Sequence, residues 1–174
     1  VVYSDILEGK VCHLLSYKRR HYDLTPGYDR FFKVADDKDI IYKLEEVGEV
    51  FFIDKPLYYY RISTRGASRG LEGLNKARDE KLIAARNAIA RREKSGVKQI
   101  PAKAFTRLLS EHYLLQAEGY ILMDKPLGRP FVACMLKSFT HHPFLNFKRK
   151  VKAALLLSRL KRMATSLLVH HNSQ

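Results

Sequence analysis

The pattern of apolar and polar residues between positions 36 and 62 predicts one helix followed by two strands. Within 36–47 the apolar positions fall on one side of a helix, at three- and four-residue spacing: Ile40, Ile41, Leu44 and Val47. Acidic residues stand at the start of this segment, where the free N–H groups of a helix need acceptors, and Gly48 follows its end. A continuous apolar run at 50–53 and a tyrosine-rich segment at 57–62, separated by a turn at 54–56, are typical of strands. A helix and two strands in so short a stretch indicate an α/β fold.

Downstream of residue 70 the pattern is almost entirely helical. Amphipathic periodicity predicts helices over 72–94, 102–123, 131–140 and 144–169. The predicted architecture is therefore an α/β portion over residues 1–70, followed by an α-helical C-terminal extension over residues 71–174. Because the chain begins without Met, inside what reads as a strand at 1–3, we expect a fragment or a trimmed product.

The last predicted helix, over 144–169, has an apolar side and a strongly basic flank. The apolar side comprises Leu155, Leu156, Leu160, Met163 and Leu167, and the flank comprises Lys148, Arg149, Lys152, Arg159, Lys161 and Arg162. A helix of this kind can lie in the headgroup region of an anionic membrane. It can equally pack its apolar side on the other helices, and the sequence leaves both readings open.

Composition limits the class of protein further. With 46% hydrophobic and 29% charged residues, the chain is expected to be globular rather than disordered. No segment reaches the roughly 18–20 apolar residues of a membrane-spanning helix, and no secretory leader is recognisable. Cys12 and Cys134 are too few for a disulfide framework and lack metal-site spacing, so a cytoplasmic setting is predicted.

The net charge of +14 is concentrated towards the C-terminus, because no Asp or Glu follows Asp124. Such asymmetry is typical of chains that meet an anionic partner, such as a membrane surface, nucleic acid or a phosphorylated substrate. A solubilising tail is the alternative. Nucleic-acid binding has the least support, since the chain lacks a helix-turn-helix, zinc or RNA-recognition signature and this function leaves the acidic cluster unexplained.

The acidic cluster at the start of the 36–47 helix is the strongest candidate for chemistry. Asp36, Asp37 and Asp39 repel one another, so a purely structural helix start would rarely need all three. One Asp acting as a helix cap is the structural interpretation. The functional interpretation is a carboxylate kept ionised by the helix N-terminus and ready to accept a proton as a general base.

The segments around this cluster carry a resemblance to a known family. They read Tyr17-Lys18-Arg19-Arg20, Tyr22-Asp23-Leu24-Thr25-Pro26-Gly27-Tyr28-Asp29, Val34-Ala35-Asp36-Asp37-Lys38-Asp39-Ile40-Ile41 and Ile53-Asp54-Lys55-Pro56-Leu57-Tyr58-Tyr59-Tyr60-Arg61-Ile62. In order and spacing, residues 17–66 resemble the acceptor-side half of family 2 glycosyltransferases. The resemblance implies part of a GT-A fold and an inverting transfer of a sugar from a nucleotide-sugar donor to a saccharide or lipid-linked acceptor.

The resemblance also assigns roles to individual residues. Asp37 matches the catalytic base of the family, and Asp36 matches the acidic residue before it. Arg61 matches an arginine that could stabilise diphosphate or acceptor charge. Ser63 stands where the family commonly has a histidine, and His13 either lines the donor pocket or is structural. Asp36, Arg61, His13 and Ser63 are therefore the predicted substrate-binding residues, and no metal ligand is predicted in this chain.

Other expectations follow from the half that the resemblance does not cover. The nucleotide-binding half of the family, with the Asp-x-Asp that holds Mg²⁺ or Mn²⁺, is expected N-terminal to Val1, so a divalent cation is expected only in the intact enzyme. We therefore expect this chain alone to transfer no sugar. Its expected place is cell-surface polysaccharide synthesis, peripheral on the inner face of the membrane. A catalytically inactive truncated product fits the same resemblance.

Overall fold

The computed structural model describes residues 4–9, 14–59, 70–122 and 128–155. The chain divides into two compact units, Val1–Ala104 and Phe105–Gln174, and each unit is described here by itself. The first unit extends past the long helix that follows residue 70. Among the described residues, none of the helices combines the length and the apolar character that crossing a bilayer requires.

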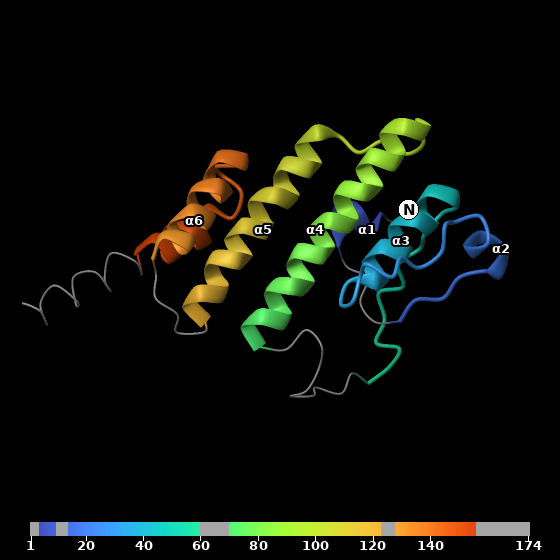
Figure 1. The fold of residues 1–174 in the computed structure, drawn as a ribbon, viewed down its shortest axis with the longest axis horizontal. Helices are drawn as coiled ribbons and strands as arrows, with labels where there is room; N and C mark the ends of the chain where they lie inside the picture. The colour runs from blue at the N-terminus through green and yellow to red at the C-terminus, as the bar shows by residue number, and fades with distance from the viewer. Residues whose placement is uncertain (1–3, 10–13, 60–69, 123–127, 156–174) are drawn as a thin grey trace, which may run out of the picture. The chain divides into compact units, whose positions relative to one another are not determined.

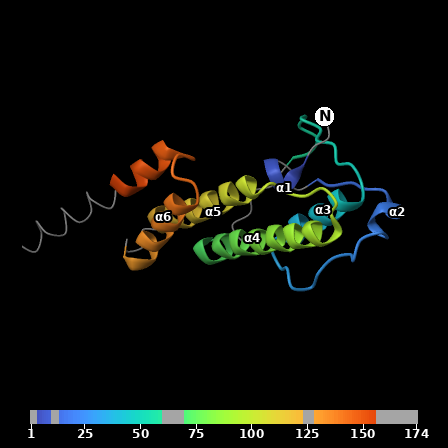
Figure 2. The ribbon, with the colours of Figure 1, turned by 90° about the horizontal axis from the view of Figure 1, so that it is seen from above.

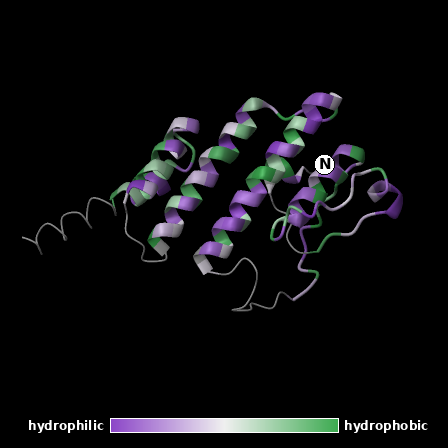
Figure 3. Cartoon of the chain, viewed as in Figure 1, coloured by the Kyte–Doolittle hydropathy of each residue, from purple (hydrophilic) through white to green (hydrophobic). Residues whose placement is uncertain are grey.

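The first unit is built around helix α3, Asp36–Val47, which packs against the long helix α4, Gly70–Ser95. Two single-turn helices, α1 (Asp5–Glu8) and α2 (Arg19–Tyr22), also contact α3 (Figures 1 and 2). Apolar side chains of both long helices fill the core: Ile40, Ile41, Leu44, Leu82, Ala84, Ala85 and Ala88. The alanines on α4 are small, so the two helices can approach closely. The rest of α4 is hydrophilic over much of its length (Figure 3).

The α/β prediction is wrong for the described part of the chain. The described fold is mostly helical, with 66% helix and 1% strand, and contains no sheet. Residues 51–59 run without regular hydrogen bonding instead of forming strands, and only Val50 makes an isolated bridge. Phe51 is 67% exposed and Ile53 61% exposed, so the run predicted as a buried strand lies on the surface. A partial GT-A domain over residues 1–70 is therefore not observed.

The physical reason lies in how strands are stabilised. A strand gains its stability from hydrogen bonds to a neighbouring strand and from packing on a half-buried surface, not from its own backbone preference. The apolar residues of 50–53 match the composition of a strand, but composition alone does not provide a second strand to pair with. The predicted strand residues 1–3 and 60–62 lie outside the described residues.

In the second unit, helix α5 (Ala102–Leu122), which enters the unit at Phe105, packs with helix α6 (Arg129–His141) and a further helix over residues 147–155. Its core consists of Leu114, Ala117, Phe131, Met135 and Ala153. The last of these helices begins at 147 rather than at the predicted 144, because residues 143–146 form a turn and Asn146 adopts a left-handed conformation with φ 53°. The predicted continuation of this helix beyond 155 lies outside the described residues.

Candidate functional site at the start of helix α3

The three aspartates of the cluster occupy three different environments on the first turn of α3. Asp36 is exposed, Asp37 is half-buried, and Asp39 is buried with 1% of its surface exposed. The residue at the N-cap position is Ala35, and it makes no side-chain capping bond, so no aspartate is the N-cap. Asp37 instead accepts a hydrogen bond at Oδ1 from the backbone N–H of Lys38, 2.7 Å away. The same N–H also donates to the carbonyl oxygen of Ala35, 3.1 Å away, so Asp37 shares this donor with the first turn of the helix.

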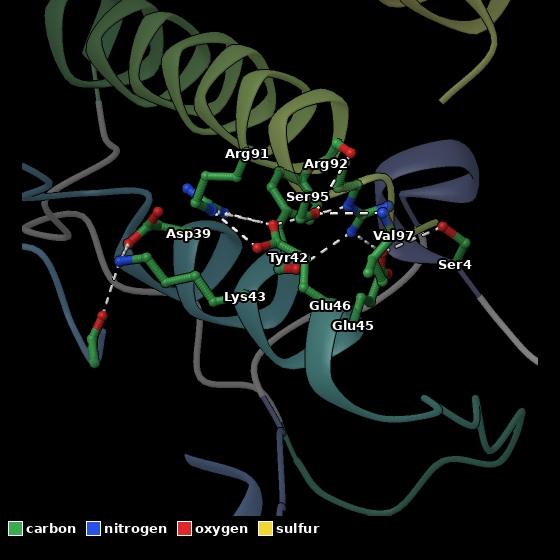
Figure 4. A network of polar contacts seen from close by, with 11 residues as sticks. Ser4, Asp39, Tyr42, Lys43, Glu45, Glu46, Arg91, Arg92, Ser95 and Val97 are labelled. Atoms are coloured by element: carbon green, nitrogen blue, oxygen red, sulfur yellow. Dashed lines mark hydrogen bonds and ion pairs between the residues drawn. The ribbon is translucent and has the colours of Figure 1, made fainter. Parts of the chain in front are cut away.

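Asp39 forms a buried ion pair inside the protein. Its Oδ2 lies 2.5 Å from the Nζ of Lys43, one helical turn further along, and both side chains are buried (Figure 4). The same Nζ donates to the carbonyl oxygen of Gly27, 2.8 Å away. Gly27 has φ +74°, and a Cβ there would lie 3.0 Å from the hydroxyl of Tyr22, so this turn requires glycine. The buried pair therefore fixes the 25–28 turn beside α3, and Asp39 has a structural role.

Glu80 of α4 holds the loop that leads into the aspartates. Its Oε2 accepts hydrogen bonds from three successive backbone N–H groups, those of Lys33, Val34 and Ala35, at 2.9, 2.8 and 3.1 Å. Burial of the carboxyl acts to raise its pKa, but these hydrogen bonds and the charge of Lys76 outweigh it, and the pKa of Glu80 lies below its ordinary value. The carboxylate therefore stays ionised and pins the residues directly before Asp36.

A second buried network fixes the far side of α3. Glu45 binds the guanidinium of Arg92 at 2.8 Å (Figure 4). It also accepts a hydrogen bond from the backbone N–H of Asp5. The carboxylate of Asp5 in turn binds Lys38 Nζ at 2.8 Å. Helices α1, α3 and α4 are therefore joined by buried charge pairs, whose removal one partner at a time is costly because a buried charge is left uncompensated.

Three tyrosines lie together on the segment that precedes the aspartates. The rings of Tyr17 and Tyr22 are stacked with centroids 5.6 Å apart, and the ring of Tyr28 is 6.0 Å from that of Tyr22. Tyr17 and Tyr28 are exposed to solvent. Burial, the hydrogen bond with Tyr17 and the charges of Tyr17 and Asp36 raise the pKa of Tyr28 to about 12. Exposed aromatic faces next to carboxylates offer both apolar contact and hydrogen-bond acceptors to a polyhydroxylated ligand.

The remaining predicted site residues cannot be placed beside this cluster. His13, Arg61 and Ser63 lie outside the described residues. Over the described ranges, no group of three or more His, Cys, Asp or Glu side chains is arranged to hold a metal ion. The divalent cation that the resemblance implies belongs to the nucleotide-binding half of the family, which residues 17–66 do not resemble.

No protein-family model, curated protein or solved structure matches this chain. The likeness to family 2 glycosyltransferases therefore rests on the residues of 17–66 themselves. Asp36 and Asp37 stay predicted site residues, whereas Glu80 and the grouping of Tyr17 with Tyr28 were missed by the sequence analysis. Glu80 has no local signal, because the backbone groups that it binds lie far away in the sequence.

Proposed function

We propose that this chain supplies the acceptor side of an inverting glycosyltransferase, with Asp37 as the general base. The transfer would take a sugar from a nucleotide-sugar donor to a saccharide or lipid-linked acceptor. The observation that carries the proposal is the different environment of each aspartate. Asp39 is paired with Lys43, whereas Asp37 is half-buried at a helix start and has one oxygen hydrogen-bonded to the N–H of Lys38. The resemblance of residues 17–66 supports the same assignment.

On the acceptor side, the proposed step needs only one protein group, Asp37, which takes up the proton that is released. The acceptor hydroxyl oxygen forms a bond to the anomeric carbon, and the bond from that carbon to the departing diphosphate breaks. The hydroxyl proton passes to Asp37. Its Oδ1 is held by the N–H of Lys38, which leaves the other oxygen for the hydroxyl, and the positive end of α3 favours the ionised form before transfer.

The exposed tyrosines support a carbohydrate as the acceptor. The C–H faces of a sugar ring pack well on aromatic faces, and Tyr17 and Tyr28 offer such faces on the segment that leads to Asp36. Asp36 is exposed and free of any ion pair in the described contacts, so it can accept hydrogen bonds from further sugar hydroxyls. We assign Asp36 to acceptor binding and Asp37 to proton transfer.

The test is nucleotide-sugar turnover by the natural-length product of the gene that encodes this sequence, compared with Asp37→Asn and Asp36→Asn. Loss of a general base lowers the turnover rate by about 10²–10⁴-fold. We expect Asp37→Asn to lose turnover within that range and Asp36→Asn to act mainly on the KM for the acceptor. The 174 residues alone are expected to give no product. Full turnover by Asp37→Asn contradicts the assignment, and no turnover by the natural-length product with any donor favours the inactive alternative.

A further inference from the structure

The turn between α6 and the 147–155 helix presents two aromatic rings to solvent. Phe144 is 80% exposed and Phe147 is 50% exposed, and their ring centroids are 6.5 Å apart. The turn is held by hydrogen bonds from the N–H of Phe147 to the carbonyl of Phe144 (3.3 Å) and from the N–H of Leu145 to His142 Nδ1 (3.2 Å). Neighbouring exposed aromatic rings on an ordered turn are typical of an interaction surface.

Lysines extend this aromatic pair along the next helix. Residues 148, 152 and 155 share one side of the 147–155 helix, opposite the buried Lys150 and Ala153. Lys148 and Lys152 are exposed, and Leu155 is 56% exposed. Phe144, Phe147, Lys148, Lys152 and Leu155 are called here the aromatic–lysine face. No acidic residue occurs anywhere in the sequence after Asp124, so no carboxylate of that part of the chain neutralises it.

The aromatic–lysine face rests on a rigid base. The Nζ of Lys150 donates to Ser110 Oγ (2.9 Å), to the carbonyl of Ser138 (2.9 Å) and to the carbonyl of His142 (2.6 Å). These bonds tie the start of the turn to α5 and to the end of α6. Arg149 forms a separate ion pair with Glu118 at 2.6 Å. Two cations of this helix therefore build the unit, and Lys148 and Lys152 remain on its surface.

We propose that the aromatic–lysine face docks on the surface of an anionic lipid bilayer. Phe144 and Phe147 would enter the boundary between headgroups and acyl chains, which aromatic side chains favour, while Lys148 and Lys152 lie at the phosphate level. Charge complementarity and the exposed apolar Leu155 select this partner over a nucleic acid, to which an aliphatic side chain contributes little. The inference is independent of the proposed glycosyl transfer, since it concerns only where the second unit binds.

The experiment measures co-sedimentation of the full chain with vesicles, without any transfer assay. One set of vesicles is phosphatidylcholine alone, and the other is an equal mixture of phosphatidylcholine and phosphatidylglycerol. Phe144→Ala/Phe147→Ala is expected to lower the affinity for anionic vesicles at least about tenfold. Lys148→Gln/Lys152→Gln is expected to lower the affinity for anionic vesicles about fivefold for each lysine. Added salt should weaken the binding of the wild type by a similar factor.

Matched controls make the same chemical changes on the first unit. Phe51→Ala removes a ring that is 67% exposed, between the exposures of Phe144 and Phe147, and Lys55→Gln/Lys94→Gln removes two exposed lysines. Both controls are expected to retain full vesicle binding, and circular dichroism should show that every variant keeps its helix content. Equal losses in the controls, equal binding to neutral vesicles, or no binding to anionic vesicles overturns the proposal. Loss of single-stranded oligonucleotide binding in the face variants with vesicle binding intact also overturns it, in favour of a nucleic acid.

Discussion

The carboxylate of Glu80 holds three backbone N–H groups at the entrance to α3, and a single atom change tests its importance. Glu80→Gln keeps the shape of the side chain but removes the charge that strengthens these hydrogen bonds. We expect a loss of about 2 kcal/mol in the free energy of unfolding, measured by urea denaturation. The control is Glu93→Gln on the exposed side of the same helix, which should change stability by less than about 0.5 kcal/mol.

The same residue predicts how stability depends on pH. Because the pKa of Glu80 is lower in the folded chain than its ordinary 4.5, the unfolded chain binds this proton first as the pH falls. The stability that Glu80 contributes is therefore complete above about pH 4.5 and is lost as the pH falls through its folded pKa. The melting temperature of the wild type should fall in this acidic window, whereas the melting temperature of Glu80→Gln should depend less on pH. An identical pH dependence for both chains contradicts this role.

The candidate site shows which kinds of residue a sequence can reveal. Asp37 could be proposed from the sequence because its neighbours in the chain form a pattern that the sequence itself displays. Glu80 could not, because its function depends on backbone groups of the 33–35 loop that only folding brings near. The same holds for Tyr17 and Tyr28, whose proximity follows from the turn that Lys43 fixes through Gly27.

At the scale of secondary structure, Lys150 determines how α6 ends. Its buried ammonium satisfies the carbonyl of Ser138 near the end of α6, the carbonyl of His142 after it, and the hydroxyl of Ser110 on α5. Lys150→Met preserves most of the volume but removes the charged donor, so the carbonyl of Ser138 keeps only its weaker neutral donors, Ser110 Oγ and the N–H of His142. We expect a loss of about 2 kcal/mol or more in the stability of the second unit, visible as faster hydrogen exchange in α6.

The control for this change lies two residues further along the same helix. Lys152 is exposed, so Lys152→Met should leave hydrogen exchange in α6 unchanged. Burial lowers the pKa of Lys150, yet the three oxygens around its ammonium favour the charged form. Slower or unchanged exchange in Lys150→Met shows that the apolar packing of this side chain, rather than its hydrogen bonds, stabilises the unit.

The helices were far more predictable than the strands. The predicted helix over 36–47 is confirmed in its bounds, as α3, and the predicted 72–94 segment lies within α4. In each case one apolar side finds its core on a neighbouring helix, so a pattern with a period of 3.6 residues is sufficient information. A run such as 50–53 carries no such information, since its structure depends on a partner strand. Its exposed phenylalanines show that apolar composition alone does not produce a sheet.

At the scale of the whole molecule, the chain consists of two units with separate cores, and this arrangement predicts how it unfolds. In the first unit, the buried pair of Glu45 and Arg92 joins α3 to α4. Arg92→Met removes one partner and leaves a buried carboxylate, which costs about 3–5 kcal/mol. Hydrogen exchange in α3 should then accelerate on the order of a hundredfold or more.

The core of Leu114, Phe131 and Met135 in the second unit does not include this pair, so exchange in α6 should stay slow. The matched control Arg86→Met, on the exposed side of α4, should alter neither unit. Equal acceleration in α3 and α6 would mean that the two units unfold as one cooperative structure.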